Sequence, residues 1–138
     1  MKVTVLLANA AEAVDGRLFI LGGGLTFLPL GLPMALAIKI DVPWGETNQP
    51  HQLRISMLDT DGNAFAFPNG GPSIEIQTQF EVGRPAGIPP GSAVPATLAF
   101  NFGPMPLTPA KRYVWHPTVD GREDEASDIP FNVLLTPR

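Results

Sequence analysis

Hydrophobic and polar residues alternate with a period of two along most of the chain. The clearest run covers residues 74–82, where apolar residues and Thr78 alternate with Glu and Gln. Because successive side chains of a β-strand point to opposite faces, this pattern predicts a strand with one buried and one solvated face. Comparable alternation predicts further strands near residues 3–7, 34–42, 53–57, 96–102, 113–119 and 131–135. Residues 9–14 are expected to supply at most a short helical turn.

Turn signals separate these runs. Asp15-Gly16 precedes the β-rich run 17–21, and Asp120-Gly121 follows another predicted strand; both pairs are typical of tight hairpin turns. Gly22-Gly23-Gly24 lacks the Lys and the following Ser or Thr of a phosphate-binding loop, so we expect a bulge or a sharp bend between strands. Eight or nine short strands in a single domain spanning residues 1–138 predict an all-β fold, a single antiparallel β-sandwich.

The C-terminal third favours the immunoglobulin-like form of that sandwich. Residues 107–115 resemble the approach to strand F of immunoglobulin-like and fibronectin-like domains. In those domains a tyrosine hydroxyl anchors the corner to the backbone a few residues upstream, and Tyr113 holds the corresponding position.

Composition narrows the range of possible functions. The net charge is −4 and the nine basic residues are scattered, so we expect no nucleic-acid binding. Cysteine is absent, which excludes disulfides and thiol chemistry. The apolar run at the N-terminus is too short for a signal peptide, and no apolar run is long enough to span a membrane. We therefore expect a cytoplasmic protein without membrane insertion.

Candidate catalytic and metal-binding residues are few. His51 and His116 lie outside any metal-ligand or nucleophile motif, and we expect both on the surface. Residues 59–63 are oxygen-rich, but position twelve of the corresponding calcium loop is Gly70 rather than Glu, so a simple turn is favoured. The acidic residues Asp120, Glu123, Glu125 and Asp128 could hold a cation if the turn brought them together, but they are more typical of a solvated turn. We expect no catalytic residue, no metal site and no cofactor.

One segment lacks the charges of an ordinary surface strand. No charged residue occurs between Leu18 and Ile38, and the apolar side chains lie among Gly and Pro. The segment is either covered on both sides by its own domain or exposed as an interface. Our leading hypothesis is a binding or assembly module that contacts another copy or a protein partner through Phe27, Leu28, Leu30, Leu32 and Met34.

Two other functions remain open. Trp44 lies among polar residues that commonly bind sugars, so a carbohydrate or small-ligand site is an alternative, formed by Asp41, Trp44, Glu46 and Asn48. A structural component of a phage or protein-shell particle is a third hypothesis.

Five segments resemble a bacterial family known only as a domain of unknown function. They are residues 8–12 (ANAAE), 15–24 (DGRLFILGGG), 42–48 (VPWGETN), 80–85 (FEVGRP) and 99–104 (AFNFGP). The resemblance runs nearly end to end and implies a bacterial or phage-related origin, with no activity attached. One departure is Ala110-Lys111 before Tyr113, where a Pro-Gly turn would be expected.

Overall fold

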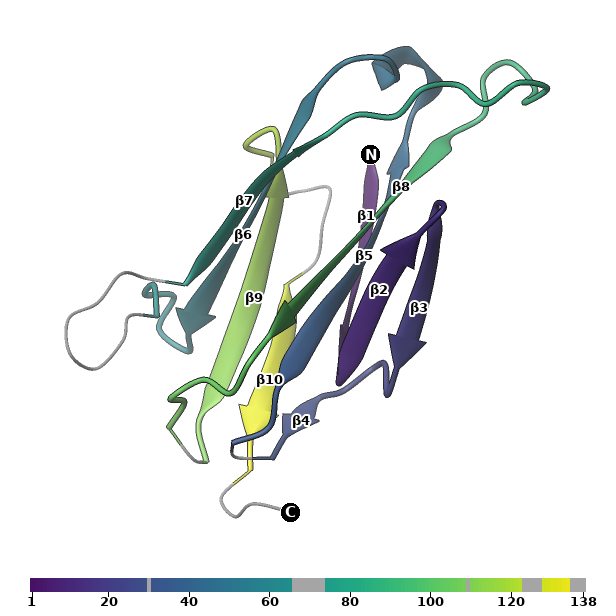
Figure 1. Cartoon of the computed structure of the whole chain (residues 1–138). Coiled ribbons are helices and arrows are strands. Elements are labelled where there is room, and N and C mark those ends of the chain that lie inside the picture. The colour runs from purple at the N-terminus through teal and green to yellow at the C-terminus, as the bar shows by residue number, and fades with distance from the viewer. Residues whose placement is uncertain (30, 66–73, 109, 123–127, 135–138) are drawn as a thin grey trace.

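The computed structural model describes residues 1–29, 31–65, 74–108, 110–122 and 128–134 (Figure 1). These residues form strands connected by turns and one short 3-10 helix, η1 (Trp44–Glu46). No helix among them is long and apolar enough to cross a membrane. The strands are β1 (Lys2–Ala8), β2 (Ala10–Val14), β3 (Arg17–Leu21), β4 (Phe27–Leu28), β5 (Met34–Val42), β6 (His51–Asp59), β7 (Glu75–Phe80), β8 (Val94–Phe102), β9 (Arg112–Val119) and β10 (Ile129–Val133).

The strands assemble into three sheets rather than one continuous antiparallel set. One sheet has the order β1-β5-β8, a second has the order β4-β10-β9-β6-β7, and β2 pairs with β3 as a hairpin. The prediction of an all-β fold is confirmed. The prediction that every pair is antiparallel is wrong, because β4 and β10 run parallel. The sequence could not reveal this pair, since a two-residue strand carries no measurable alternation.

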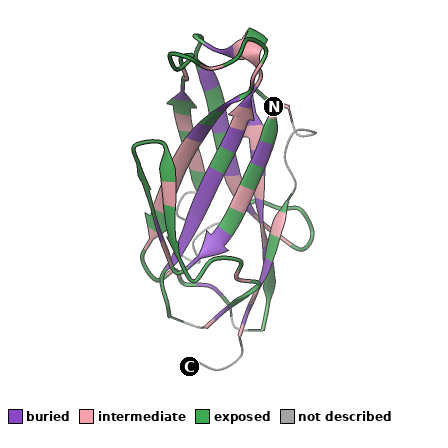
Figure 2. Ribbon diagram, turned by 90° about the vertical axis from the view of Figure 1, so that its right-hand side faces the viewer, coloured by how far each residue is buried: buried purple, intermediate pink, exposed green. Residues whose placement is uncertain are grey.

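The two larger sheets face each other across one shared core. Buried and exposed residues alternate along the strands, as the period-two pattern predicts (Figure 2). Burying each large aliphatic or aromatic side chain stabilises the fold by about 1.5–3 kcal/mol. The core draws on both sheets; its largest fully buried side chains include Leu36, Ile38 and Ile40 of β5, Leu53, Ile55 and Met57 of β6, Tyr113 and Trp115 of β9, and Phe131 of β10.

Residues 9–14, which were expected to supply at most a short helical turn, contain no helix, and Ala10–Val14 form strand β2 of the hairpin. Its turn matches the sequence prediction, because Asp15 and Gly16 both have positive φ, 51° and 73°. Positive φ at both central positions is the type I′ geometry that suits the twist of a two-residue hairpin. The alanine-rich β2 shows no clear alternation, and pairing with β3 supplies the order that its own sequence does not encode.

The hairpin packs on the outer face of the three-stranded sheet. Ala11 buries against Ala35 and Ala37 of β5, with Leu18 and Ala99 at the margin of this cluster. Small side chains on both surfaces allow the hairpin to approach closely. Asn101 of β8 then fastens the hairpin: its Oδ1 accepts from the Ala11 N–H at 3.1 Å, and its Nδ2 donates to the Ala11 carbonyl at 2.7 Å.

The three glycines after β3 turn the chain sharply back toward β1. Gly22 has φ of +65°, and a Cβ at this position would lie 2.1 Å from Oδ1 of Asn9. A larger residue would therefore have to displace the Asn9 side chain and adopt a left-handed conformation that favours glycine. The N–H groups of Gly24 and Leu25 both donate to the Leu7 carbonyl, at 2.8 and 2.9 Å. The predicted bend between strands is confirmed.

The corner before β9 has the bond that the sequence resemblance implies. The Thr108 N–H donates to the Tyr113 hydroxyl at 3.0 Å, five residues upstream of the tyrosine. Ala110 has φ of 60°, a left-handed conformation that glycine adopts more easily. Proline, the residue expected at position 110, is fixed at a φ near −65° and cannot adopt this conformation, so the turn differs from the expected Pro-Gly turn.

Replacing Asn101 with Ala should loosen the hairpin without disrupting the main core. The Ala11 N–H and carbonyl lose their partners, and at about 1 kcal/mol per bond we expect a loss of about 1–2 kcal/mol. Urea unfolding measures the loss, and hydrogen exchange at the Ala11 amide should accelerate. Gln77→Ala, an exposed polar truncation on β7, is the matched control; equal losses in both variants would contradict the tethering role of Asn101.

Candidate functional site

The predicted partner-binding segment divides between core and surface. Leu28 and Met34 are 3% and 1% exposed, and both pack in the core between the two sheets. Their assignment to a partner surface is corrected. The strand register explains why Leu28 is buried: its pairing with Val133 of β10 turns Leu28 inward and leaves Phe27 outward. Phe27 and Leu32 are 56% and 39% exposed, as an interface requires. Leu30 lies outside the described residues.

Exposed large apolar side chains concentrate in one part of the chain. Every such side chain among the described residues lies between residues 6 and 32. The concentration includes β3, where Phe19 is 56% and Leu21 is 70% exposed. We call this set the N-terminal apolar surface: Leu6, Val14, Phe19, Ile20, Leu21, Phe27 and Leu32.

The sequence contains a signal for the β3 part of this surface. Residues 18–21 are apolar at four consecutive positions, so both faces of a strand there must be apolar. One face, with Leu18, meets the sheet beneath it. The other face, with Phe19 and Leu21, has no sheet to cover it. Sequence reasoning focused on residues 25–36 and missed this second half.

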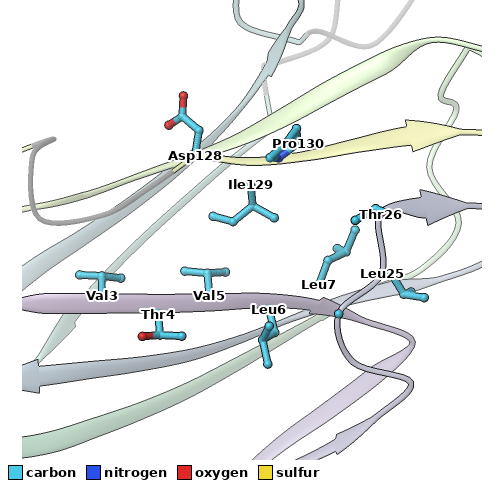
Figure 3. Close-up of a pocket in the computed structure, with 11 residues that line it drawn as sticks. Val3, Thr4, Val5, Leu6, Leu7, Leu25, Thr26, Asp128, Ile129 and Pro130 are labelled. Carbon is cyan, nitrogen blue, oxygen red and sulfur yellow. The ribbon is translucent and has the colours of Figure 1, made fainter.

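A groove runs along the free edge of β1 (Figure 3). Its volume is about 400 Å³, and its walls come from β1 on one side and from residues 24–26 and 128–130 on the other. Figure 3 shows Ile129 projecting toward β1, with Leu25 near the Leu7 end. A second hollow shares Gly24, Leu25 and Thr26 with this groove and extends it to Phe27. The groove therefore adjoins the N-terminal apolar surface.

The residues proposed for sugar binding are engaged with their own neighbours. The Arg84 guanidinium lies 3.8 Å from the centre of the Trp44 ring, and it donates to the Trp44 carbonyl at 2.7 Å. Asp41 pairs with Lys39 at 3.2 Å, and Glu46 pairs with Arg122 at 3.4 Å. Asn48 is exposed. One face of Trp44 is thus occupied by Arg84, and the two carboxylates are directed to separate cations.

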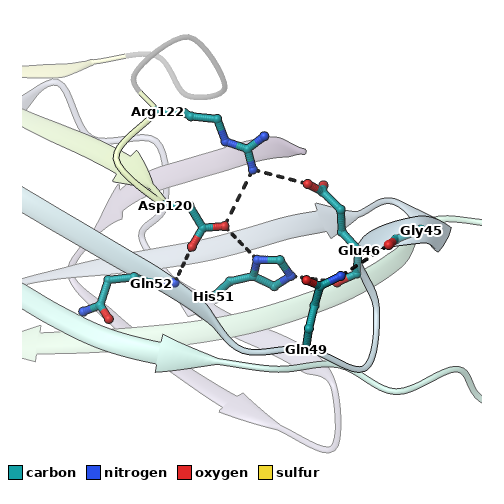
Figure 4. A network of polar contacts seen from close by, with 7 residues as sticks. All are labelled: Gly45, Glu46, Gln49, His51, Gln52, Asp120 and Arg122. Carbon is teal, nitrogen blue, oxygen red and sulfur yellow. Dashed lines mark hydrogen bonds and ion pairs between the residues drawn. The ribbon is translucent and has the colours of Figure 1, made fainter.

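A polar network lies at one end of the sheets, where η1, the start of β6 and the turn after β9 meet (Figure 4). The side chain of His51 is 4% exposed, which corrects the expectation of a surface histidine. Its Nδ1 lies 2.7 Å from Oδ2 of Asp120, and its Nε2 lies 2.7 Å from the Glu46 carbonyl. Both partners are acceptors, so a ring that donates from both nitrogens, the imidazolium, satisfies both contacts.

The contacts within this network shift the pKa values of both His51 and Asp120. Burial of His51 disfavours its charged form, but the hydrogen bonds to the Glu46 carbonyl and the Asp120 carboxylate outweigh burial and raise its pKa above 6.5. Burial opposes ionisation of Asp120 too, yet the bond from the Gln52 N–H, the contact with His51 and the charge of Arg122 lower its pKa below 3.8. Because both ring nitrogens of His51 are engaged, the arrangement ties loops together through this side chain.

The sequence could not reveal this network, because its members are distant along the chain. Asp120 and His51 are 69 positions apart. Two other acidic candidates have nearer partners. Oδ1 of Asp59 accepts from the backbone N–H groups of Asp61 and Asn63, which closes its own turn, and Asp128 pairs with His116. Among the described residues, no group of three His, Asp or Glu side chains could hold a metal ion. Glu123 and Glu125 lie outside the described residues.

Comparison with known protein families gives one match that covers nearly the whole chain. The model of one family matches residues 3–134, nearly the full length. The chain belongs to a family of unknown function (DUF6941). Membership of DUF6941 confirms the predicted resemblance to a domain of unknown function and supplies no activity. No curated protein and no solved structure matches the chain. The function of this DUF6941 domain must therefore be argued from its own surfaces.

The His51 network should make stability depend on pH in a defined direction. The raised pKa of His51 means that its contribution is complete below pH 6.5 and is lost as pH rises through the folded-state value. The lowered pKa of Asp120 means that its contribution is present above pH 3.8 and is lost as pH falls further. Urea unfolding between pH 5 and 9 in a His116→Gln background isolates His51. His51→Gln should cost about 1.5–3 kcal/mol near pH 6 and flatten this alkaline decline; an unchanged decline would refute the assignment.

Neighbouring substitutions in β4 should separate its two faces. Leu28→Asp places an unpaired carboxylate in the core and should cost several kcal/mol, enough to unfold the domain. Phe27→Asp places the same group in solvent and should leave the fold intact. Circular dichroism and thermal unfolding compare the pair, and similar unfolding of both variants would contradict the register of β4 against β10.

Proposed function

We propose that this protein is a non-catalytic assembly module that docks another protein chain through the N-terminal apolar surface. The observation that carries the proposal is the confinement of large exposed apolar side chains to residues 6–32 among the described residues. Single exposed apolar residues are normal on soluble proteins, whereas contiguous apolar patches mark interaction sites, and Phe19, Ile20 and Leu21 line one shared hollow on the hairpin. A second observation agrees with it: grooves at β1, near Phe27 and on the hairpin adjoin the same residues.

The opposite sheet supports the same division of roles. On β7 the solvated positions are Glu75, Gln77 and Gln79, and Glu75 pairs with Arg54 of β6. Charged and amide side chains of this kind keep a surface soluble and discourage contact with other chains. The solvated face of β7 is therefore polar, whereas the N-terminal apolar surface is not. This difference suits a module that docks its partner in a single orientation.

We propose that the scaffold is an immunoglobulin-like sandwich. The hydrogen bond from the Thr108 N–H to the Tyr113 hydroxyl supports this assignment. Sandwiches of this kind are rigid and commonly present partner surfaces from their strands and loops. The absence of catalysis is part of the proposal, and it is supported by the engagement of both His51 nitrogens within the fold.

Site-specific photo-crosslinking in cells that produce the protein tests the docking surface. A photoreactive phenylalanine analogue at Phe19 or Phe27 should yield one discrete adduct, since both side chains lie on the proposed surface. The same analogue at Gln79 of β7 should yield none. The mass of the adduct identifies the partner class, and twice 14.7 kDa would indicate a second copy.

A companion variant makes this result specific. Leu21→Asp, an exposed change, should abolish the adduct at Phe19 while leaving the fold intact. No adduct at Phe19 and Phe27, or equal labelling at Gln79, would overturn the proposed function.

A further inference from the structure

The edge strands of the two large sheets differ in how they are protected against pairing. In β8, Pro95 occupies a position at which another residue would point its backbone N–H away from β5, toward the open edge of the sheet. In β7, the positions whose side chains face solvent carry Glu and Gln. Proline and charged residues are the usual means of blocking a sheet edge. From Val3 to Ala8, β1 contains neither proline nor charge. Among the described residues, no second strand pairs with the edge of β1 that faces away from β5.

The direction of the β1 backbone groups follows from one contact. The Leu7 carbonyl accepts from Gly24 and Leu25 and so points away from β5. In an antiparallel ladder the N–H and C=O of one residue point the same way, and alternate residues share that direction. The backbone groups of Val3 and Val5 must then also face outward, into the groove of Figure 3. No hydrogen bond to them occurs in the described part of the chain.

We propose that β1 pairs antiparallel with β1 of a second copy, about a two-fold axis at Thr4. This inference rests on the proposed assembly function and names a partner for one edge of its surface. Val3 of each copy lies opposite Val5 of the other, and the two residues of each such pair exchange N–H···O bonds. A symmetric interface must be self-complementary, and this register satisfies all the outward groups of Val3 and Val5 in both copies.

The length of the free edge selects this register. At one end, the Leu7 carbonyl is already taken by Gly24 and Leu25, so a partner strand must end before it. The free stretch is therefore short and centred near Thr4. A short self-pairing strand fits it, whereas a long extended peptide would meet residues 24–25.

The chemistry of the groove matches the incoming strand. Val3 and Val5 point their side chains toward the core side of the sheet, where they are buried or half-buried. The same side chains of the second copy would enter the apolar groove beside Ile129. Lys2 lies on the opposite face of β1, with Thr4 and Leu6, and therefore stays outside this apolar groove. The register places Lys2 opposite Leu6 of the other copy and keeps the two Lys2 residues apart.

A single cysteine tests the pairing, because the chain has no other. Thr4 is exposed, and in the proposed register it faces its own copy across a non-hydrogen-bonded pair, with Cα atoms about 4.5 Å apart. Disulfides join Cα atoms about 4.4–6.8 Å apart. Thr4→Cys should therefore form a disulfide dimer rapidly with oxidised glutathione as the oxidant, and reduction should return the monomer.

Two matched variants control for random collision. Leu6→Cys lies on the same face of β1, but the two copies of residue 6 would be about 14 Å apart along the strands, too far for a disulfide. Gln77→Cys lies on the edge strand of the other sheet. Both should remain monomeric on gels without reductant. Equal dimer formation by all three variants, or none by Thr4→Cys, would overturn the pairing.

The outcome separates this inference from the function on which it rests. If Phe19 gives a discrete photo-adduct while Thr4→Cys fails to dimerise, the docking surface stands and the β1 pairing is wrong. If Thr4→Cys dimerises while Phe19 and Phe27 give no adduct, the edge pairing stands and the apolar docking surface is wrong.

Discussion

The fold depends on the burial of β5 on both faces. Its two edges are bonded to β1 and β8, its inner face joins the shared core, and the first half of its outer face lies under the hairpin. Residues of β5 that are buried on both faces cannot carry a charge. The first charged residue of the strand, Lys39, lies beyond the part covered by the hairpin. The hairpin can cover it because Ala35 and Ala37 are small and because Asn101 satisfies the backbone of Ala11.

This double burial explains much of the uncharged stretch that suggested an interface. The two alternatives raised by the sequence are both realised, in different residues. Met34 and Leu36 are core, and Phe27 and Leu32 are surface. Local alternation could identify β5 and β7, because each has a regular apolar face. It could not assign the faces of residues 25–33, where glycines and prolines interrupt the period and β10 sets the register.

The sequence also predicted the turns, but it did not predict contacts between residues that lie far apart in the chain. Asp15-Gly16 and Gly22–Gly24 specify their conformations through local sterics, and Tyr113 specifies a bond five residues away. The hairpin's place on the sheet depends on Asn101, which is 90 positions from Ala11. The His51 network joins three loops that no local pattern relates. The sequence thus encodes elements and turns visibly, while partners that lie far apart in the chain become apparent only in the folded protein.

The central claim is that this chain assembles through its N-terminal residues, with β1 as the self-pairing edge. In the described structure, the N-terminal residues carry the exposed large apolar side chains. The core and the side chain of His51 are buried, and the solvated face of β7 is polar. Light scattering of the purified protein over a hundredfold range of concentration tests the claim most directly. The account predicts a mass that reaches a stable multiple of 14.7 kDa. A monomer of 14.7 kDa at every concentration would contradict it.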